Sequence, residues 1–94
     1  MKILFAPEAE QDLDTAVDFL VGRNPPAAVQ LVDGIRLLVS QLAEGEFDGP
    51  VQILRSGETV RSWPLPPFRL YYQRTDEVLL VVRIYHQARR LIAR

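Results

Sequence analysis

Five consecutive apolar residues, Val78–Val82, constrain the fold more than any other stretch of this sequence. A run without polar alternation that is rich in β-branched Val is typical of a strand buried on both faces. Such a strand belongs inside a sheet, with cover above and below it. We therefore expect the run to be a central strand that continues through Arg83 to Ile84 and Tyr85 and ends near His86, the one histidine of the chain.

The beginning of the chain predicts a short strand followed by an amphipathic helix. Residues 2–6 have the length and composition of a strand. Pro7 suits the first position of a helix, because its missing N–H costs nothing there. From Ala9 to Leu20 apolar residues recur on one helical face. The acidic residues Glu10, Asp14 and Asp18 form a stripe elsewhere on the helix, which we interpret as solvated.

A second helix has the strongest helical periodicity in the sequence. Apolar residues from Ala28 to Leu42 recur at spacings of three and four, as on one packed face. Asn24 is a suitable N-cap and Pro25 a suitable first residue. Only a short turn then separates the two helices, so they form an antiparallel hairpin. Gly34 lies inside the second helix, and we interpret it as a point of close approach between the helices.

The second half of the chain predicts strands on the N-terminal side of the apolar run. Residues 59–63 and 68–74 alternate in polarity, and the proline-rich segment 64–67 makes the turn between them. A tight turn at residues 75–77 then leads into the apolar run. Residues 45–58 are predicted to be a loop that contains a short extended piece.

Length and composition describe one α+β domain over residues 1–94. The predicted order is β-α-α-β-β-β, with the helical hairpin on one face of a small, mostly antiparallel sheet. No apolar run approaches the roughly 18 residues of a transmembrane helix. The apolar part of the N-terminus is too short for a signal peptide, so we expect a cytoplasmic protein with no membrane contact. Without cysteine and with one histidine, the sequence predicts no metal and no cofactor.

Charge is divided unevenly along the chain. Residues 1–50 hold nine acidic and three basic residues, a net charge of −6, whereas residues 51–94 hold three acidic and eight basic ones, a net charge of +5. All the basic residues of the second half are arginines. Arginine makes bidentate contacts with carboxylate and phosphate, which favours a recognition surface. Pairing of these arginines with the acids of the N-terminal helices is the alternative, and the sequence leaves both open.

Several side chains suited to binding or catalysis lie at or near the last predicted strands. These are Arg61, Arg69, Tyr71, Arg83, His86, Arg89 and Arg90. Arginine and aromatic side chains on a sheet can bind RNA, and arginine with histidine can also support phosphodiester cleavage. No catalytic triad or glycine-rich phosphate loop accompanies them, and a lone histidine at a strand end is more often structural.

Three segments carry a family resemblance: KILFAPEAEQDLDTAVDFL at 2–20, NPPAAVQLVDGIRLLVSQL at 24–42 and PFRLYYQRTDEVLLVVRIYHQARR at 67–90. Together with Val60-Arg61, their order and spacing resemble the toxins of the RelE/ParE superfamily. These are the stable partners in bacterial type II toxin–antitoxin pairs. The resemblance covers nearly the whole chain, and only residues 45–58 match poorly.

The resemblance implies a compact toxin neutralised by a cognate antitoxin whose acidic or amphipathic segment wraps its surface. Two activities occur among such toxins: RelE-like members cleave mRNA on the ribosome, and ParE-like members poison DNA gyrase. For mRNA cleavage, the catalytic residues would be Arg61, Arg83 and His86. Residues expected to bind the target or the antitoxin are Arg69, Tyr71, Arg89 and Arg90. Neither activity implies sequence-specific DNA binding by this chain alone.

We favour the ParE-like activity. The sequence pI of about 5.7 and the single lysine disfavour approach to ribosomal RNA, since that association relies on phosphate neutralisation. The ending His86-Gln-Ala-Arg also resembles the ParE side. The alternatives are a RelE-like endoribonuclease, an inactive antitoxin-binding module, and a small enzyme built on His86 that is unrelated to toxins. Whether the chain is an enzyme therefore stays open at the level of sequence.

Overall fold

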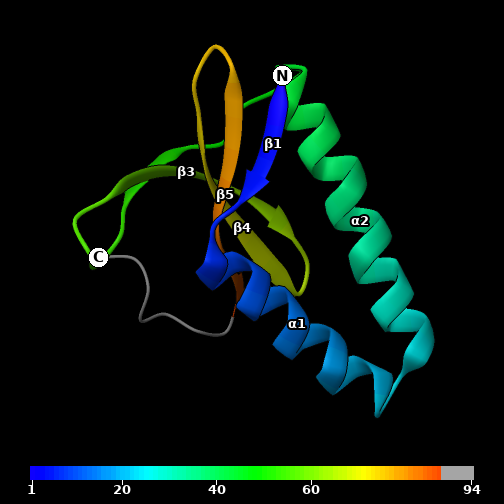
Figure 1. Cartoon of the computed structure of the whole chain (residues 1–94). Helices are drawn as coiled ribbons and strands as arrows, with labels where there is room; N and C mark the ends of the chain where they lie inside the picture. Colours follow the sequence, from blue (N-terminus) through cyan, green and yellow to red (C-terminus); the bar gives the residue numbers. More distant parts are fainter. Residues whose placement is uncertain (88–94) are drawn as a thin grey trace.

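The structure, a computed structural model, describes residues 1–87 as a helical hairpin packed on one face of a five-stranded sheet (Figure 1). The elements are β1 (Lys2–Phe5), α1 (Pro7–Val21), α2 (Pro25–Ala43), β2 (Val51–Ile53), β3 (Thr59–Leu65), β4 (Phe68–Arg74) and β5 (Val78–His86). The strand order is β1-β5-β4-β3-β2, in which β1 and β5 are parallel and the other neighbours antiparallel. The predicted fold class and order are confirmed, and the short extended piece is the edge strand β2.

Strand β5 occupies the interior position that its apolar run predicts. It pairs with β1 on one side and with β4 on the other. Leu79 and Val81 are fully buried in the core on the helix side, while Leu80 and Val82 belong to a second apolar cluster on the opposite face. The run therefore contributes to an apolar cluster on each face of the sheet, which explains the absence of polar residues in it.

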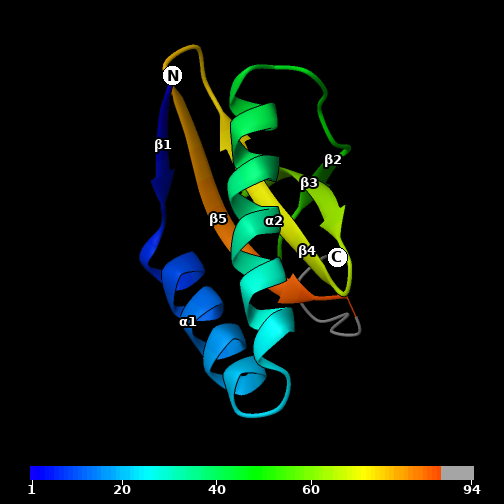
Figure 2. The ribbon, with the colours of Figure 1, turned by 90° about the vertical axis from the view of Figure 1, so that its right-hand side faces the viewer.

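The two helices begin where the sequence predicts, at Pro7 and Pro25. The side chain of Asn24 accepts a hydrogen bond of 3.3 Å from the backbone N–H of Ala27, and Pro25 starts α2. Figure 2 shows the resulting hairpin, with α1 and α2 side by side along the sheet. Within residues 1–87, neither helix combines the length and apolarity needed to cross a membrane.

The interpretation of Gly34 as a point of helix–helix approach was wrong. A Cβ atom at Gly34 would lie 3.2 Å from the Cδ1 atom of Leu65, at the end of β3. The missing side chain therefore lets α2 approach the sheet, not α1.

Strand β3 runs two residues further than predicted and includes Pro64. The backbone N–H of Ser62 donates to the carbonyl of Pro50, so Ser62 turns its hydrogen-bonding groups toward β2. By the alternation of a strand, the nitrogen of Pro64 points the same way, beyond the region where β2 pairs with β3. Proline is tolerated there because no strand in the described part of the chain needs an N–H at this position.

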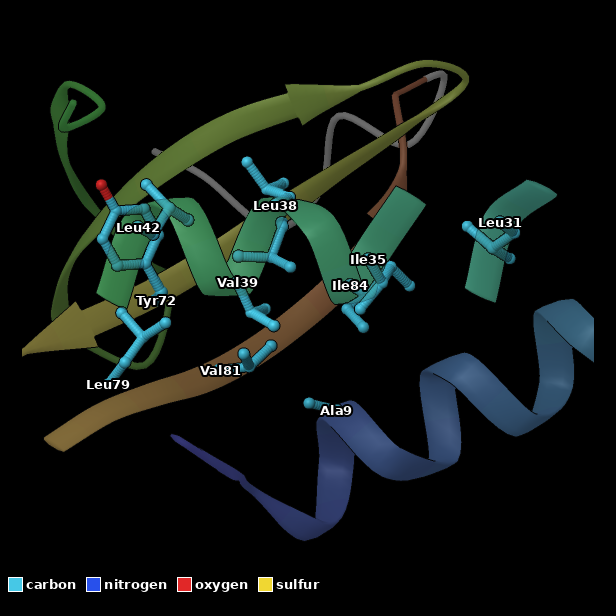
Figure 3. Close-up of a cluster of buried hydrophobic side chains, with 11 residues drawn as sticks. Ala9, Leu31, Ile35, Leu38, Val39, Leu42, Tyr72, Leu79, Val81 and Ile84 are labelled. Atoms are coloured by element: carbon cyan, nitrogen blue, oxygen red, sulfur yellow. The ribbon is translucent and has the colours of Figure 1, made fainter. Parts of the chain in front are cut away.

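The main core lies between α2 and the helix-facing side of the sheet (Figure 3). Its buried members come from both helices and from β4 and β5: Ala9, Leu31, Ile35, Leu38, Val39, Leu42, Leu70, Tyr72, Leu79, Val81 and Ile84. The predicted alternation in β4 is confirmed, since Leu70 and Tyr72 belong to this core and Tyr71 to the second cluster.

Candidate binding groove

A groove of about 870 Å³ lies between the helical hairpin, the turn from β3 to β4 and the end of β5. Much of its wall is apolar, including Ala16, Phe19, Leu31, Leu65, Phe68 and Ile84. Phe19 is 55% exposed although it is a large apolar side chain. A groove with such walls suits an apolar segment of another chain.

Arg83 is bound by a carboxylate from α1. Its Nε and Nη2 atoms donate to the two carboxylate oxygens of Asp12 at 2.9 and 3.0 Å. The backbone N–H of Ile84 donates to the same carboxylate at 3.0 Å. These bidentate hydrogen bonds raise the pKa of Arg83 above its ordinary value. The positive charge of Arg83 is therefore compensated within the fold.

The position of this ion pair follows from the length of β1. Strand β1 ends at Phe5 and pairs with β5 only as far as Val81. Beyond Val81, no strand among residues 1–87 pairs with this edge of β5, and α1 passes there instead (Figure 1). Asp12 takes the place of a strand acceptor for the N–H of Ile84, because a buried backbone donor needs a partner.

Strand β5 contains a β-bulge at Val82, where its pairing with β4 shifts by one residue. Tyr71 pairs with Arg83 and Tyr72 with Val81, so one residue of β5 has no partner in β4. This β-bulge lets Val81 and Ile84, three residues apart, both face the helix-side core. Arg83 follows the bulge at the open edge, and its guanidinium carbon lies 4.3 Å from the centroid of the Tyr85 ring.

His86 lies in the same groove as Arg83. Its ring stands edge-on to Phe68, with the ring centroids 5.5 Å apart, and the side chains of Arg83, Tyr85 and His86 all line the groove. The structure thus brings together two of the three residues predicted for mRNA cleavage.

Arg61 lies apart from these two residues. In β3 it pairs with Tyr72, whereas His86 pairs with Phe68, four residues away along β4. This separation corresponds to roughly 13 Å along the strand. The Nη1 atom of Arg61 donates to the carbonyl of Gly49 at 2.9 Å, so Arg61 holds the loop between α2 and β2.

The same loop is bound by a second set of contacts around Asp48. The hydroxyl of Tyr72 donates to Asp48 at 2.8 Å and accepts from the N–H of Gly49 at 2.8 Å. Arg74 pairs with Asp48 and donates to the carbonyl of Leu42, at the end of α2, at 2.7 Å. Burial raises the pKa of Tyr72. For Arg83, the structure confirms pairing with an acid of an N-terminal helix, whereas Arg74 pairs with an acid of the loop after α2.

Arg69 and Tyr71 lie on the sheet face that the helices leave uncovered. The Nε atom of Arg69 donates to the hydroxyl of Ser62 at 2.9 Å. Tyr71 is buried among apolar residues of the second cluster, which raises its pKa. The candidate residues are therefore distributed over both faces of the sheet. Arg89 and Arg90 lie outside the described residues.

Sequence reasoning missed Asp12, which organises the groove. Glu10, Asp14 and Asp18 are exposed, as their interpretation as a solvated stripe predicts, but Asp12 is half-buried. Asp12 lies two residues from both Glu10 and Asp14 and so falls on a different side of α1. An acid on the inner side of an amphipathic helix was the available signal that it has a buried partner.

Comparison with known proteins adds two findings. The sequence model of the family described as ParE toxin of type II toxin-antitoxin system, parDE, matches residues 3–91. Among solved structures, a chain from the chromosomal ParDE TA system of P. aeruginosa is similar, with a TM-score of 0.67 and 25% sequence identity. The similarity covers 92% of this chain and 95% of that chain. The search of curated proteins found no match.

Proposed function

Because this chain belongs to the family of ParE toxins of type II toxin–antitoxin systems, we propose that it inhibits DNA gyrase and is neutralised by a cognate antitoxin bound in the groove. Its action would take place in the cytoplasm, where gyrase works.

The ion pair between Arg83 and Asp12 is the observation that favours gyrase inhibition over mRNA cleavage. Cleavage of a phosphodiester needs a cation to stabilise the transition state next to a group that moves a proton. Arg83 stands near His86 in the groove, but its charge is compensated by Asp12. Arg61 is engaged with the loop at Gly49. The formal net charge of −1 also disfavours association with ribosomal RNA.

The groove supports the proposal that an antitoxin neutralises this protein. Apolar walls from two helices and a sheet suit an amphipathic segment whose apolar side chains insert as anchors. An antitoxin segment bound there would cover Arg83, Tyr85 and His86 together.

The direct test is gyrase-catalysed supercoiling of relaxed plasmid with and without the purified protein. We expect inhibition, with cleaved DNA trapped on gyrase. Folded protein that leaves supercoiling unchanged contradicts the gyrase target. An in vitro translation assay then tests ribosome-dependent cleavage of mRNA, in which His86→Ala should abolish the activity.

Neutralisation through the groove has its own test. Thr15 is exposed on α1 and lines the groove, so Thr15→Trp should obstruct the antitoxin without disturbing the core. Asp14→Trp is the matched control, because Asp14 is exposed on the same helix and does not line the groove. Co-expression with the antitoxin should rescue the growth of cells that make the control but not of cells that make Thr15→Trp. Equal rescue of both places the antitoxin elsewhere.

A further inference from the structure

We propose that Asp12 determines which segments the groove accepts: by compensating Arg83, it makes the groove select an uncharged apolar segment over an acidic one. This inference rests on the proposed function only in taking the bound segment to be part of the antitoxin. The charge selectivity itself is a property of the groove.

The contacts of Asp12 leave little of the Arg83 charge available to a ligand. Two guanidinium nitrogens of Arg83 already donate to the carboxylate. The guanidinium group also lies over the ring of Tyr85. The side chain of Asp12 is 15% exposed and that of Arg83 29%, so water screens the pair only in part. A second carboxylate arriving at Arg83 would lose its hydration and gain only a cation that is already paired.

The other polar side chains of the groove do not restore a net charge. Among the described residues that line it, the formally charged side chains are Asp12 and Arg83, of opposite sign. Gln11, Thr15 and Gln30 contribute neutral polar groups. Asp12 and Arg83 therefore cancel in formal charge, and the apolar walls favour an apolar ligand. His86 also lines the groove, and the guanidinium of Arg23 lies 4.0 Å from the ring centroid of Phe19, but both are present in every variant compared below.

A single substitution separates the charge of Asp12 from its hydrogen bonds. In Asp12→Asn the amide oxygen can still accept from the N–H of Ile84, so the open edge of β5 keeps its partner. The negative charge is lost, and Arg83 becomes an available cation in the groove. Asp14→Asn is the matched control, because it removes the same charge from the exposed side of the same helix.

Two fluorescent probes of similar shape report the selectivity. 1-Anilinonaphthalene-8-sulfonate is an apolar anion, and N-phenyl-1-naphthylamine is its uncharged counterpart. We expect Asp12→Asn to bind the anionic probe about tenfold more tightly than the wild-type protein, as for one new charge-assisted contact. Binding of the uncharged probe should change less than about twofold. Asp14→Asn should leave both affinities as in the wild type, and Thr15→Trp should weaken both.

Two further measurements keep the proposal open to refutation. Asp12→Asn combined with Arg83→Gln should return the anionic probe to its wild-type affinity. Affinity for the anionic probe should depend less steeply on salt in the wild type than in Asp12→Asn, because the variant adds an unpaired cation that salt screens. A wild-type salt dependence as steep as that of Asp12→Asn, or an equal gain in Asp14→Asn, overturns the proposal. These results do not depend on gyrase, so a failure of the gyrase target is seen separately.

Discussion

At the scale of single residues, Asp12 is the best example of a side chain whose role depends on its surroundings. It accepts hydrogen bonds from Arg83 and from the backbone of Ile84, and both donors lie on a strand more than seventy residues away. One carboxylate thereby joins α1 to the open edge of β5 and neutralises the cation beside the groove. Asp14, two residues further along α1, has the same chemistry but is exposed.

Replacement of Asp12 by Ala should lower the free energy of unfolding by about 2 kcal/mol, because it leaves Arg83 and the N–H of Ile84 without their acceptor. Asp14→Ala should change it by less than about 0.5 kcal/mol. Urea denaturation of the two variants measures the difference. Equal losses would mean that the ion pair contributes nothing specific.

The stability of the fold should fall at alkaline pH, in part because of Tyr72. Burial raises its pKa above the ordinary value of 10.0, so the folded state holds the phenolic proton more tightly than the unfolded state does. This stabilisation is complete below pH 10 and is lost as the pH rises through the higher pKa of the folded protein. Tyr72→Phe should therefore show a shallower decline above pH 10. Urea denaturation from pH 7 to 11 measures the free energy of unfolding of both proteins. An equal decline above pH 10 in the wild type and in Tyr72→Phe would contradict this prediction.

At the scale of elements, the loop between α2 and β2 is fixed to the sheet more closely than its composition suggests. Tyr72, Arg61 and Arg74 all contact it. Gly49 lies so near β3 that a Cβ atom would come within 1.6 Å of the backbone oxygen of Ser62. Glycine is needed there for space, since any side chain would force the two backbones apart.

Gly49→Ala should therefore destabilise the protein by at least about 3 kcal/mol. Gly22→Ala is the control, because the nearest atoms to its new Cβ lie at an ordinary 3.8 Å, and it should change stability by less than about 1 kcal/mol. Thermal unfolding of both variants provides the measurement. A small effect at Gly49 would show that the loop can move away from β3 at little cost.

The features that could be predicted from the sequence are those that neighbouring residues determine. The start of α2 at Pro25 follows from its neighbour Asn24, and the two faces of β4 follow from simple alternation. The bulge at Val82 and the partner of Arg83 depend on contacts between distant segments. No pattern within a short window encodes them. Of the residues that line the groove, Arg83 and His86 were accordingly predicted as candidate site residues, but Asp12 was not.

At the scale of the whole molecule, one core joins both helices to the sheet. The single tryptophan, Trp63, packs against this core and lies 4.3 Å from the ring centroid of Phe47. Its fluorescence therefore reports on the side of the sheet near β3, whereas far-UV circular dichroism reports mainly on the helices.

Because these parts share one core, both signals should follow a single unfolding transition with the same midpoint in urea. Leu70→Ala, a substitution at the centre of the core, should shift both midpoints equally. Midpoints that separate in the wild type or in the variant would show that the hairpin and the sheet unfold independently.

The parallel pairing of β1 with β5 also has a consequence for the order in which the protein is made. Of the five described strands, β1 is made before the others and its strand partner, β5, is made after them, so β1 must wait while residues 6–77 are synthesised (Figure 1). Pairing across so long a loop is slow to form. The wall of the groove that β5 supplies is also completed last. A newly made chain thus spends its synthesis without a finished groove, and a segment that binds the groove can do so only after that delay.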